Sequence, residues 1–98
     1  MKGCLEIVSY QLKQHVSFNE FEKHAVKLQE MLSEVDGFMK REVFRSKDNA
    51  HWVELVEWAS PEAAKRAEDM LMQQSCMQEA MELIDATTIR MHVMEQVL

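Results

Sequence analysis

Five side chains that could take part in acid–base chemistry fall on predicted strands of this chain. Glu6 and Tyr10 lie on the first strand, Glu54 on the third, and Arg90 and His92 on the last. Alternate residues of a strand share one face, so the spacing predicts that all five lie on one side of a sheet. A desolvated carboxylate there has a raised pKa and can exchange a proton near neutral pH. His92 needs little tuning for the same role, and Arg90 can hold an anionic group.

We therefore predict Glu54, His92 and Arg90 as catalytic candidates. Ligand contacts are predicted for Glu6, Tyr10 and two tryptophans of the third strand, Trp52 and Trp58. Each has an ordinary structural alternative.

In that alternative, Glu6 or Glu54 pairs with Arg90 and fixes strand register or an interface between subunits. The tryptophans then belong to the core, and the tip of Tyr10 lies in water.

Alternation and turn residues predict the strands that position these groups. The strands span residues 4–12, 38–46, 51–59 and 86–97. A polar turn at residues 47–50 joins the second and third strands into a hairpin.

Helices are predicted from their capping signals. Ser17 with Glu20 forms a capping box, and Ser60-Pro61-Glu62 is a typical helix start. Gly37 stands where a helix is typically followed by a left-handed residue. A further capping box, from Ser75 to Gln78, predicts a short helix over residues 77–84.

This order of elements predicts an α+β fold of the ferredoxin-like βαββαβ kind. Residues 1–98 are expected to form one domain, because two would be too small to hold separate cores. Its four-stranded antiparallel sheet would carry the helices on one face, with the first strand between the third and the fourth.

The two faces of this sheet differ, but neither resembles a surface made for water. One predicted face is almost purely apolar, and it comprises Leu5, Ile7, Val53, Leu55, Ile89, Met91 and Val93. The other is mixed, and it comprises Glu6, Val8, Tyr10, Trp52, Glu54, Val56, Trp58, Arg90, His92 and Met94. The helices can cover only one face, so a second copy of the chain is expected to cover the other as a homodimer.

Composition excludes several other classes of partner. A formal net charge of −6 argues against nucleic acid or an anionic membrane. No apolar run is long enough to span a bilayer, and Glu6 interrupts any apolar leader, so a cytoplasmic location is expected. Cys4 and Cys76 are expected to be free thiols, and the scattered histidines predict no metal site.

Three segments carry a resemblance to a known family: residues 6–10, residues 35–38 with the sequence Val-Asp-Gly-Phe, and residues 55–63 around Trp58. Together they resemble the dimeric α+β barrel superfamily, and within it the antibiotic biosynthesis monooxygenase-like domains. The resemblance implies that two sheets pair into a barrel and that each subunit holds a ligand pocket between sheet and helices. It also implies that Trp58 borders this pocket and that Glu54, four residues earlier, faces the same space.

The family's oxygenase and haem-degrading members often carry a histidine in or after the second helix, but residues 67–81 contain none. Haem ligation is therefore not expected, and no cofactor is predicted. Cofactor-free oxygenases need a base that makes an electron-rich anion, a cation or dipole that holds it, and an apolar cavity open to O2. The family also includes many proteins without assigned activity.

Three interpretations follow. The first is a homodimer that binds a small apolar or aromatic ligand and acts as a cofactor-independent monooxygenase on an aromatic or polyketide-like compound. The second is a non-catalytic carrier or sensor, and the third is a purely structural dimer. An open cavity beside Trp58 would disfavour the third, and an unpaired Glu54 or His92 in that cavity would favour the first.

Overall fold

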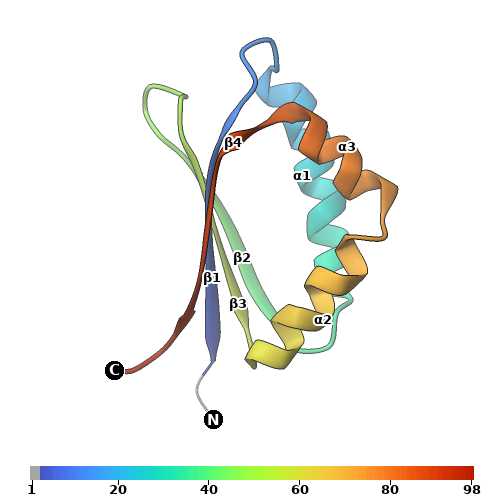
Figure 1. Cartoon of the computed structure of the whole chain (residues 1–98), viewed down its shortest axis with the longest axis vertical. Coiled ribbons are helices and arrows are strands. Elements are labelled where there is room, and N and C mark those ends of the chain that lie inside the picture. The colour runs from blue at the N-terminus through green and yellow to red at the C-terminus, as the bar shows by residue number, and fades with distance from the viewer. Residues whose placement is uncertain (1–2) are drawn as a thin grey trace.

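The computed structural model describes residues 3–98 of the chain. The elements follow the predicted order, including the short helix before the last strand (Figure 1). They are β1 (Cys4–Leu12), α1 (Phe18–Ser33), β2 (Phe38–Arg45), β3 (Trp52–Trp58), α2 (Pro61–Leu71), α3 (Ser75–Leu83) and β4 (Ile84–Glu95).

The four strands form one antiparallel sheet in the order β2-β3-β1-β4. The prediction that the first strand lies between the third and the fourth is therefore confirmed. Within residues 3–98, the helices α1, α2 and α3 all lie on one face of this sheet, and the other face carries no helix (Figure 1).

Local chemistry explains where the first two helices begin. The side chain of Ser17 accepts a hydrogen bond from the Glu20 amide, and that of Ser60 accepts one from the Ala63 amide. Each cap satisfies a backbone donor that has no partner within its helix.

Helix α3 departs from the prediction. It begins at Ser75 rather than Met77, and its N-cap is Gln74, whose side chain makes no capping hydrogen bond. The predicted capping box at Ser75 is therefore wrong, because Ser75 already lies inside the helix. Strand β4 then follows α3 directly, at Ile84 rather than Ala86.

Gly37 closes the turn between α1 and β2 with a φ of +95°. A Cβ atom at this position would lie 2.5 Å from the Cβ of Ala63 at the start of α2. The turn therefore needs glycine for two reasons, the left-handed backbone and the close approach of α2.

The register of β4 corrects the predicted faces of the sheet. Val8 pairs with Met91 and Glu6 with Val93, whereas Ile7 pairs with His92 and Ser9 with Arg90. Directly paired residues share a face. Arg90 and His92 therefore lie on the face that carries no helix, opposite to Glu6 and Tyr10, and the predicted clustering of the five groups is wrong.

The physical cause is an irregularity in β4. Between the pairs Ser9–Arg90 and Gln11–Asp85, the segment 86–89 lies opposite Tyr10 alone. The Asp85 carboxylate accepts hydrogen bonds from the Thr87 amide and hydroxyl, and Thr88 Oγ1 accepts one from the Gln11 amide. These bonds hold the extra residues out of the ladder. The irregularity changes which side chains of β4 point to each face of the sheet.

The buried side chains form two separate clusters under the helices. One contains Cys4, Leu32, Val56, Trp58, Ala63, Ala64 and Ala67. The other contains Tyr10, Phe21, Trp52, Leu83 and Ile84. A cavity lined by members of both clusters separates them.

Both cysteines are free, as predicted. Burial and the nearby carboxylates of Glu6 and Glu62 raise the pKa of the Cys4 thiol, so it remains protonated in the core. Among residues 3–98, no helix is long and apolar enough to cross a membrane.

Candidate functional site

A cavity of about 660 Å³ lies between the sheet and the three helices. Its size falls within the ~300–1,000 Å³ typical of small-molecule sites. Side chains from β1, β2, β3 and β4 form its floor, and α1, α2 and α3 form its roof. Glu68, Met72 and Met91 line it and are exposed, so it reaches the surface between α2 and the β4 edge of the sheet.

The wall of this cavity is predominantly apolar. Its apolar lining consists of Val8, Phe21, Ala25, Leu28, Leu32, Val56, Trp58, Ala67, Leu71, Ala80, Ile84 and Ile89, with Met72, Met77, Met81 and Met91. The polar side chains among the lining residues are few, and they come from both layers of the molecule: Glu6, Tyr10, His24, Arg41, Glu54, Glu68 and Gln78. Such a wall suits an apolar or aromatic molecule that carries a small number of polar groups.

Glu54 lies at the floor of the cavity, but it is fully engaged. The Arg41 Nε and Nη2 atoms each lie 2.9 Å from Glu54 Oε1, and the Tyr10 hydroxyl donates to Oε2 at 2.5 Å. The Arg41 side chain is only 2% exposed, so water screens this pair little.

Arg41 also connects the sheet to α1. Its Nη1 atom donates to the Ala25 carbonyl at 2.9 Å and to the Gln29 side chain at 3.3 Å. Burial, and then the Glu54 charge, raise the pKa of the Tyr10 hydroxyl, so Tyr10 remains a proton donor to Glu54. The three side chains thus form a connected buried network that fixes the floor of the cavity.

Glu6 has a different environment. Its Oε1 accepts a hydrogen bond from the Trp58 indole nitrogen at 2.5 Å, and no lysine, arginine or histidine forms an ion pair with it within residues 3–98. Burial raises the pKa of this carboxyl group against the lowering effect of the Trp58 hydrogen bond, and the charges of Glu68 and Glu54 raise it further. Glu6 is therefore the cavity carboxylate best suited to accept a proton.

Trp58 is 1% exposed, and its ring meets Phe38 edge-on at 5.6 Å. It therefore belongs to the core and also lines the cavity, so the two readings offered by the sequence are not exclusive. Trp52 is buried in the other cluster and does not line this cavity.

The structure thus brings four of the seven predicted site residues together: Glu6, Tyr10, Glu54 and Trp58. Arg90 and His92 are exposed on the opposite face and do not reach the cavity. The predicted alternative pairing of Glu54 or Glu6 with Arg90 is consequently absent, since Arg41 takes that place for Glu54.

Among the polar lining residues that were not predicted, Arg41 and His24 reach the buried part of the cavity wall. Arg41 lies on the edge strand β2, where a basic side chain ordinarily points to water, so its type gave no signal. His24 lies on α1, and its buried Nδ1 atom has no hydrogen bond and stands 3.9 Å from Glu79 Oε2. His24 lies three residues after Phe21 and four residues before Leu28, so it belongs to the apolar stripe of this helix. That spacing is the signal in the sequence that could have indicated an inward-facing side chain.

No group of three or more histidine, cysteine or acidic side chains within residues 3–98 is arranged to hold a metal ion.

Comparison with known proteins identifies the fold. No family model matches the chain, and no curated protein matches it. Solved structures do match over the whole chain. SnoaB, a cofactor-independent oxygenase from Streptomyces nogalater, is 16% identical with a TM-score of 0.78, covering 100% of this chain and 96% of its own.

Two further structures agree. A conserved protein from Methanosarcina mazei Go1 is 15% identical with a TM-score of 0.78, covering 99% of this chain and 95% of its own. A protein from Bordetella bronchiseptica, provisionally assigned as an antibiotic biosynthesis monooxygenase, is 18% identical with a TM-score of 0.72, and each chain is covered completely. The chain therefore has the ferredoxin-like fold of the antibiotic biosynthesis monooxygenase-like proteins, as the sequence resemblance implied.

Proposed function

We propose that this chain is a homodimeric, small-molecule-binding protein that acts as a cofactor-independent monooxygenase on an aromatic or polyketide-like compound. The observation that carries this proposal is the apolar cavity with Glu6 at its wall, a carboxylate with a raised pKa and, among residues 3–98, without a cationic partner. The oxygenase activity named for the similar fold of SnoaB supports the same reaction class.

In the proposed reaction, Glu6 removes a proton from an activated CH2 group of the bound compound. The resulting carbanion bonds to one atom of O2, and the peroxide then loses water, which leaves a carbonyl group in place of the CH2. The overall change consumes one O2 and releases one water, and Glu6 returns its proton to the departing oxygen. Trp58 is the positioning residue, since its indole N–H orients the Glu6 carboxylate.

Glu54 has no such role in this proposal. Its two oxygens are occupied by Arg41 and Tyr10, so the pair supports the cavity floor. Arg90 and His92 are also removed from the proposed catalytic group, because they lie on the other face of the sheet.

The second subunit is proposed to cover the helix-free face. Apolar side chains of the central strands stand there, namely Leu5, Ile7, Val53 and Leu55, next to the half-exposed Phe44 and Met94. Charged side chains border them, including Lys40, Glu42, Glu57 and Arg90. An apolar centre with a polar rim is typical of a protein interface.

A carrier function is the second candidate. Its support is that Glu54 is bonded to Arg41 and Tyr10 and that His92 lies on the opposite face of the sheet, whereas an unpaired Glu54 or His92 in the cavity was expected for a monooxygenase.

Oxygen uptake with an anthrone, a tricyclic compound with an activated CH2 group, separates the two candidates. We expect catalysed O2 consumption and quinone formation, with a rate that rises with pH as Glu6 ionises and that is lost in Glu6→Gln. Saturable anthrone binding without O2 uptake above the uncatalysed rate would instead identify a carrier. Glu22→Gln serves as a matched control, because Glu22 is an exposed glutamate of α1 that does not line the cavity.

A further inference from the structure

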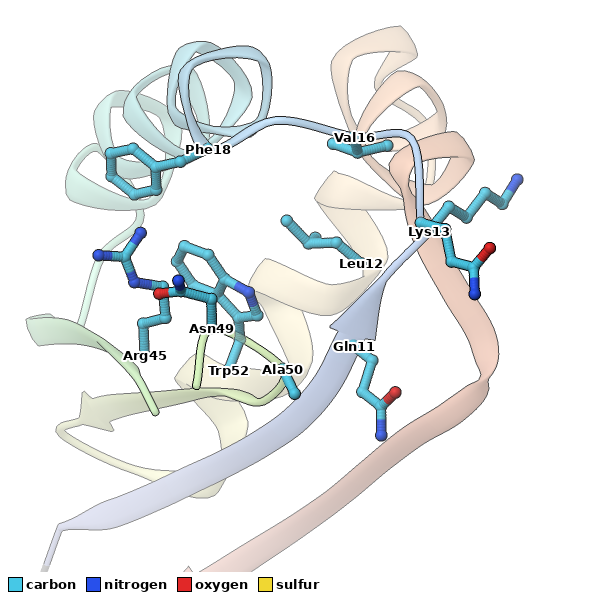
Figure 2. A pocket seen from close by; sticks show the side chains of 10 residues that line it. Gln11, Leu12, Lys13, Val16, Phe18, Arg45, Asn49, Ala50 and Trp52 are labelled. Atoms are coloured by element: carbon cyan, nitrogen blue, oxygen red, sulfur yellow. The ribbon is translucent and has the colours of Figure 1, made fainter. Parts of the chain in front are cut away.

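A second pocket lies at the end of the sheet where the turn between β2 and β3 approaches the start of α1. Its volume is about 370 Å³. The end of β1, the loop that follows it, Phe18 of α1, and the hairpin from Arg45 to Trp52 form its walls (Figure 2). Trp52 and Phe21 meet edge-on at 5.1 Å, and Phe21 lines the main cavity, so this aromatic contact divides the two spaces.

The charges around this second pocket are one-sided. Although the chain carries 17 acidic and 11 basic residues, no aspartate or glutamate lines this pocket, whereas Lys13 and Arg45 do. Its remaining polar lining side chains are the amides of Gln11, Gln14 and Asn49. Such a set favours an anionic occupant over a cationic one.

Arg45 is held in place without an anionic partner. Its guanidinium carbon lies 5.0 Å from the Phe18 ring centre and 5.7 Å from that of Trp52, and these two rings stack at 5.6 Å. Within residues 3–98 it forms no ion pair. Stacking on aromatic faces leaves the N–H groups at the edge of a guanidinium free for a carboxylate.

The second independent observation is an orphaned donor. Trp52 is 4% exposed, and its indole nitrogen is buried without a hydrogen-bond partner. Figure 2 shows that this nitrogen lies on the edge of the ring that faces Leu12 across the pocket. A buried N–H without a partner is costly, and an acceptor brought by a ligand would relieve that cost.

We propose that this second pocket binds a small carboxylate with an apolar body. The carboxylate lies between the Arg45 guanidinium and the Trp52 indole N–H, and the apolar body packs against Leu12 and Val16. The indole nitrogen has almost no exposed surface, so the carboxylate reaches it when the exposed side chain of Asn49, which lines the same pocket, shifts. This site is separate from the proposed reaction and does not depend on it.

The test uses the two tryptophans of the chain as reporters. Their indole N–H signals in a ¹H–¹⁵N spectrum are assigned with Trp58→Phe, and benzoate is then titrated into the full-length protein. We expect the Trp52 signal to shift saturably while the Trp58 signal stays in place. Benzamide, the neutral analogue, should bind more weakly than benzoate by a factor of about ten or more.

Variants then separate the contacts. Arg45→Gln should weaken benzoate binding by about tenfold or more. Arg45→Lys should weaken it less, because lysine keeps the positive charge but cannot donate two parallel hydrogen bonds to one carboxylate. Lys13→Gln should have the smallest effect, since Figure 2 shows Lys13 pointing away from the pocket. Dispersed amide signals in each variant verify folding.

Four outcomes would overturn the proposal. The first is no shift of the Trp52 signal at millimolar benzoate, and the second is a shift of the Trp58 signal instead, which would place benzoate in the main cavity. The third is benzamide binding as tightly as benzoate. The fourth is inorganic phosphate binding as tightly as benzoate, which would show an anion site that makes no use of an apolar body.

Discussion

Two carboxylates of the same cavity have opposite surroundings. Glu54 is held by a buried arginine and a tyrosine, whereas Glu6 accepts a hydrogen bond from an indole N–H and is repelled by other carboxylates. Each environment leads to a prediction about single side chains.

Glu6 should reduce stability as pH rises. Its folded-state pKa lies above its unfolded value, so folding takes up a proton between the two values. Its contribution is therefore fully favourable below the ordinary glutamate pKa and is lost as pH rises through the raised value. We expect Glu6→Gln to be increasingly more stable than the natural chain as pH rises across this window, measured by urea unfolding. A stability difference that does not change with pH would contradict the raised pKa.

Arg41→Met should be strongly destabilising, because it leaves the buried Glu54 side chain without its cationic partner. Breaking such a pair costs roughly 3–5 kcal/mol. The double variant Arg41→Met with Glu54→Gln should recover part of this loss in the same urea experiment. A loss below about 1 kcal/mol in the single variant would show that solvent reaches the pair.

The sequence predicted which side chains share the cavity face better than it predicted which side chains bind one another. Glu6, Tyr10, Glu54 and Trp58 were correctly grouped, because β1 and β3 pair without interruption from Cys4 to Tyr10 and alternation is sufficient there. Arg41 was missed and Arg90 chosen instead, since no local pattern distinguishes an arginine turned inward on an edge strand from one turned to water.

Helix caps provide a pair of predictions at the scale of elements. Ser60→Ala removes the side-chain acceptor from the Ala63 amide and should cost about 1 kcal/mol. Gln74→Asp should add the cap that α3 lacks and gain roughly 0.5–1 kcal/mol, because Gln74 already has the extended backbone of an N-cap. Thermal unfolding measures both. An unchanged midpoint in Gln74→Asp would mean that its donors are satisfied in another way.

Most element boundaries could be predicted, because capping residues, Gly37 and the polar hairpin turn act locally. The phase of β4 could not, because it depends on hydrogen bonds from Asp85, Thr87 and Thr88 that hold the segment 86–89 out of the ladder. The alternation of Ile89, Met91 and Val93 was read correctly as one face. Whether these residues share a face with Ile7 or with Val8 is set by the pairing of β1 with β4, which are far apart in the chain. Composition alone predicted the face of Ile7, whereas the structure shows the face of Val8.

At the scale of the whole molecule, the helix-free face leads to a prediction about assembly. Leu55 lies at the centre of this face, paired with Ile7 on one side and Glu42 on the other. Leu55→Asp should leave the fold intact and dissociate the proposed dimer, because it places a charge in the apolar centre of the interface.

Sedimentation velocity at micromolar protein measures this change. The natural chain should sediment as a dimer and Leu55→Asp as a monomer, while Val26→Asp, on the exposed surface of α1, serves as the control. A monomeric natural chain would contradict the proposed assembly without affecting the cavity within each subunit.

The cavity wall contains four thioether side chains, those of Met72, Met77, Met81 and Met91. Sulfur in a thioether is readily converted to a sulfoxide, which is polar and would disturb an apolar binding surface. In the proposed reaction a peroxide forms in this cavity, where it can oxidise these sulfur atoms. The activity of the protein should therefore fall in proportion to the number of turnovers it has completed. Peptide mass spectrometry of used protein should find the added oxygen at the half-buried Met77 and Met81 before it appears at the exposed Met39 of β2, which lies outside the cavity.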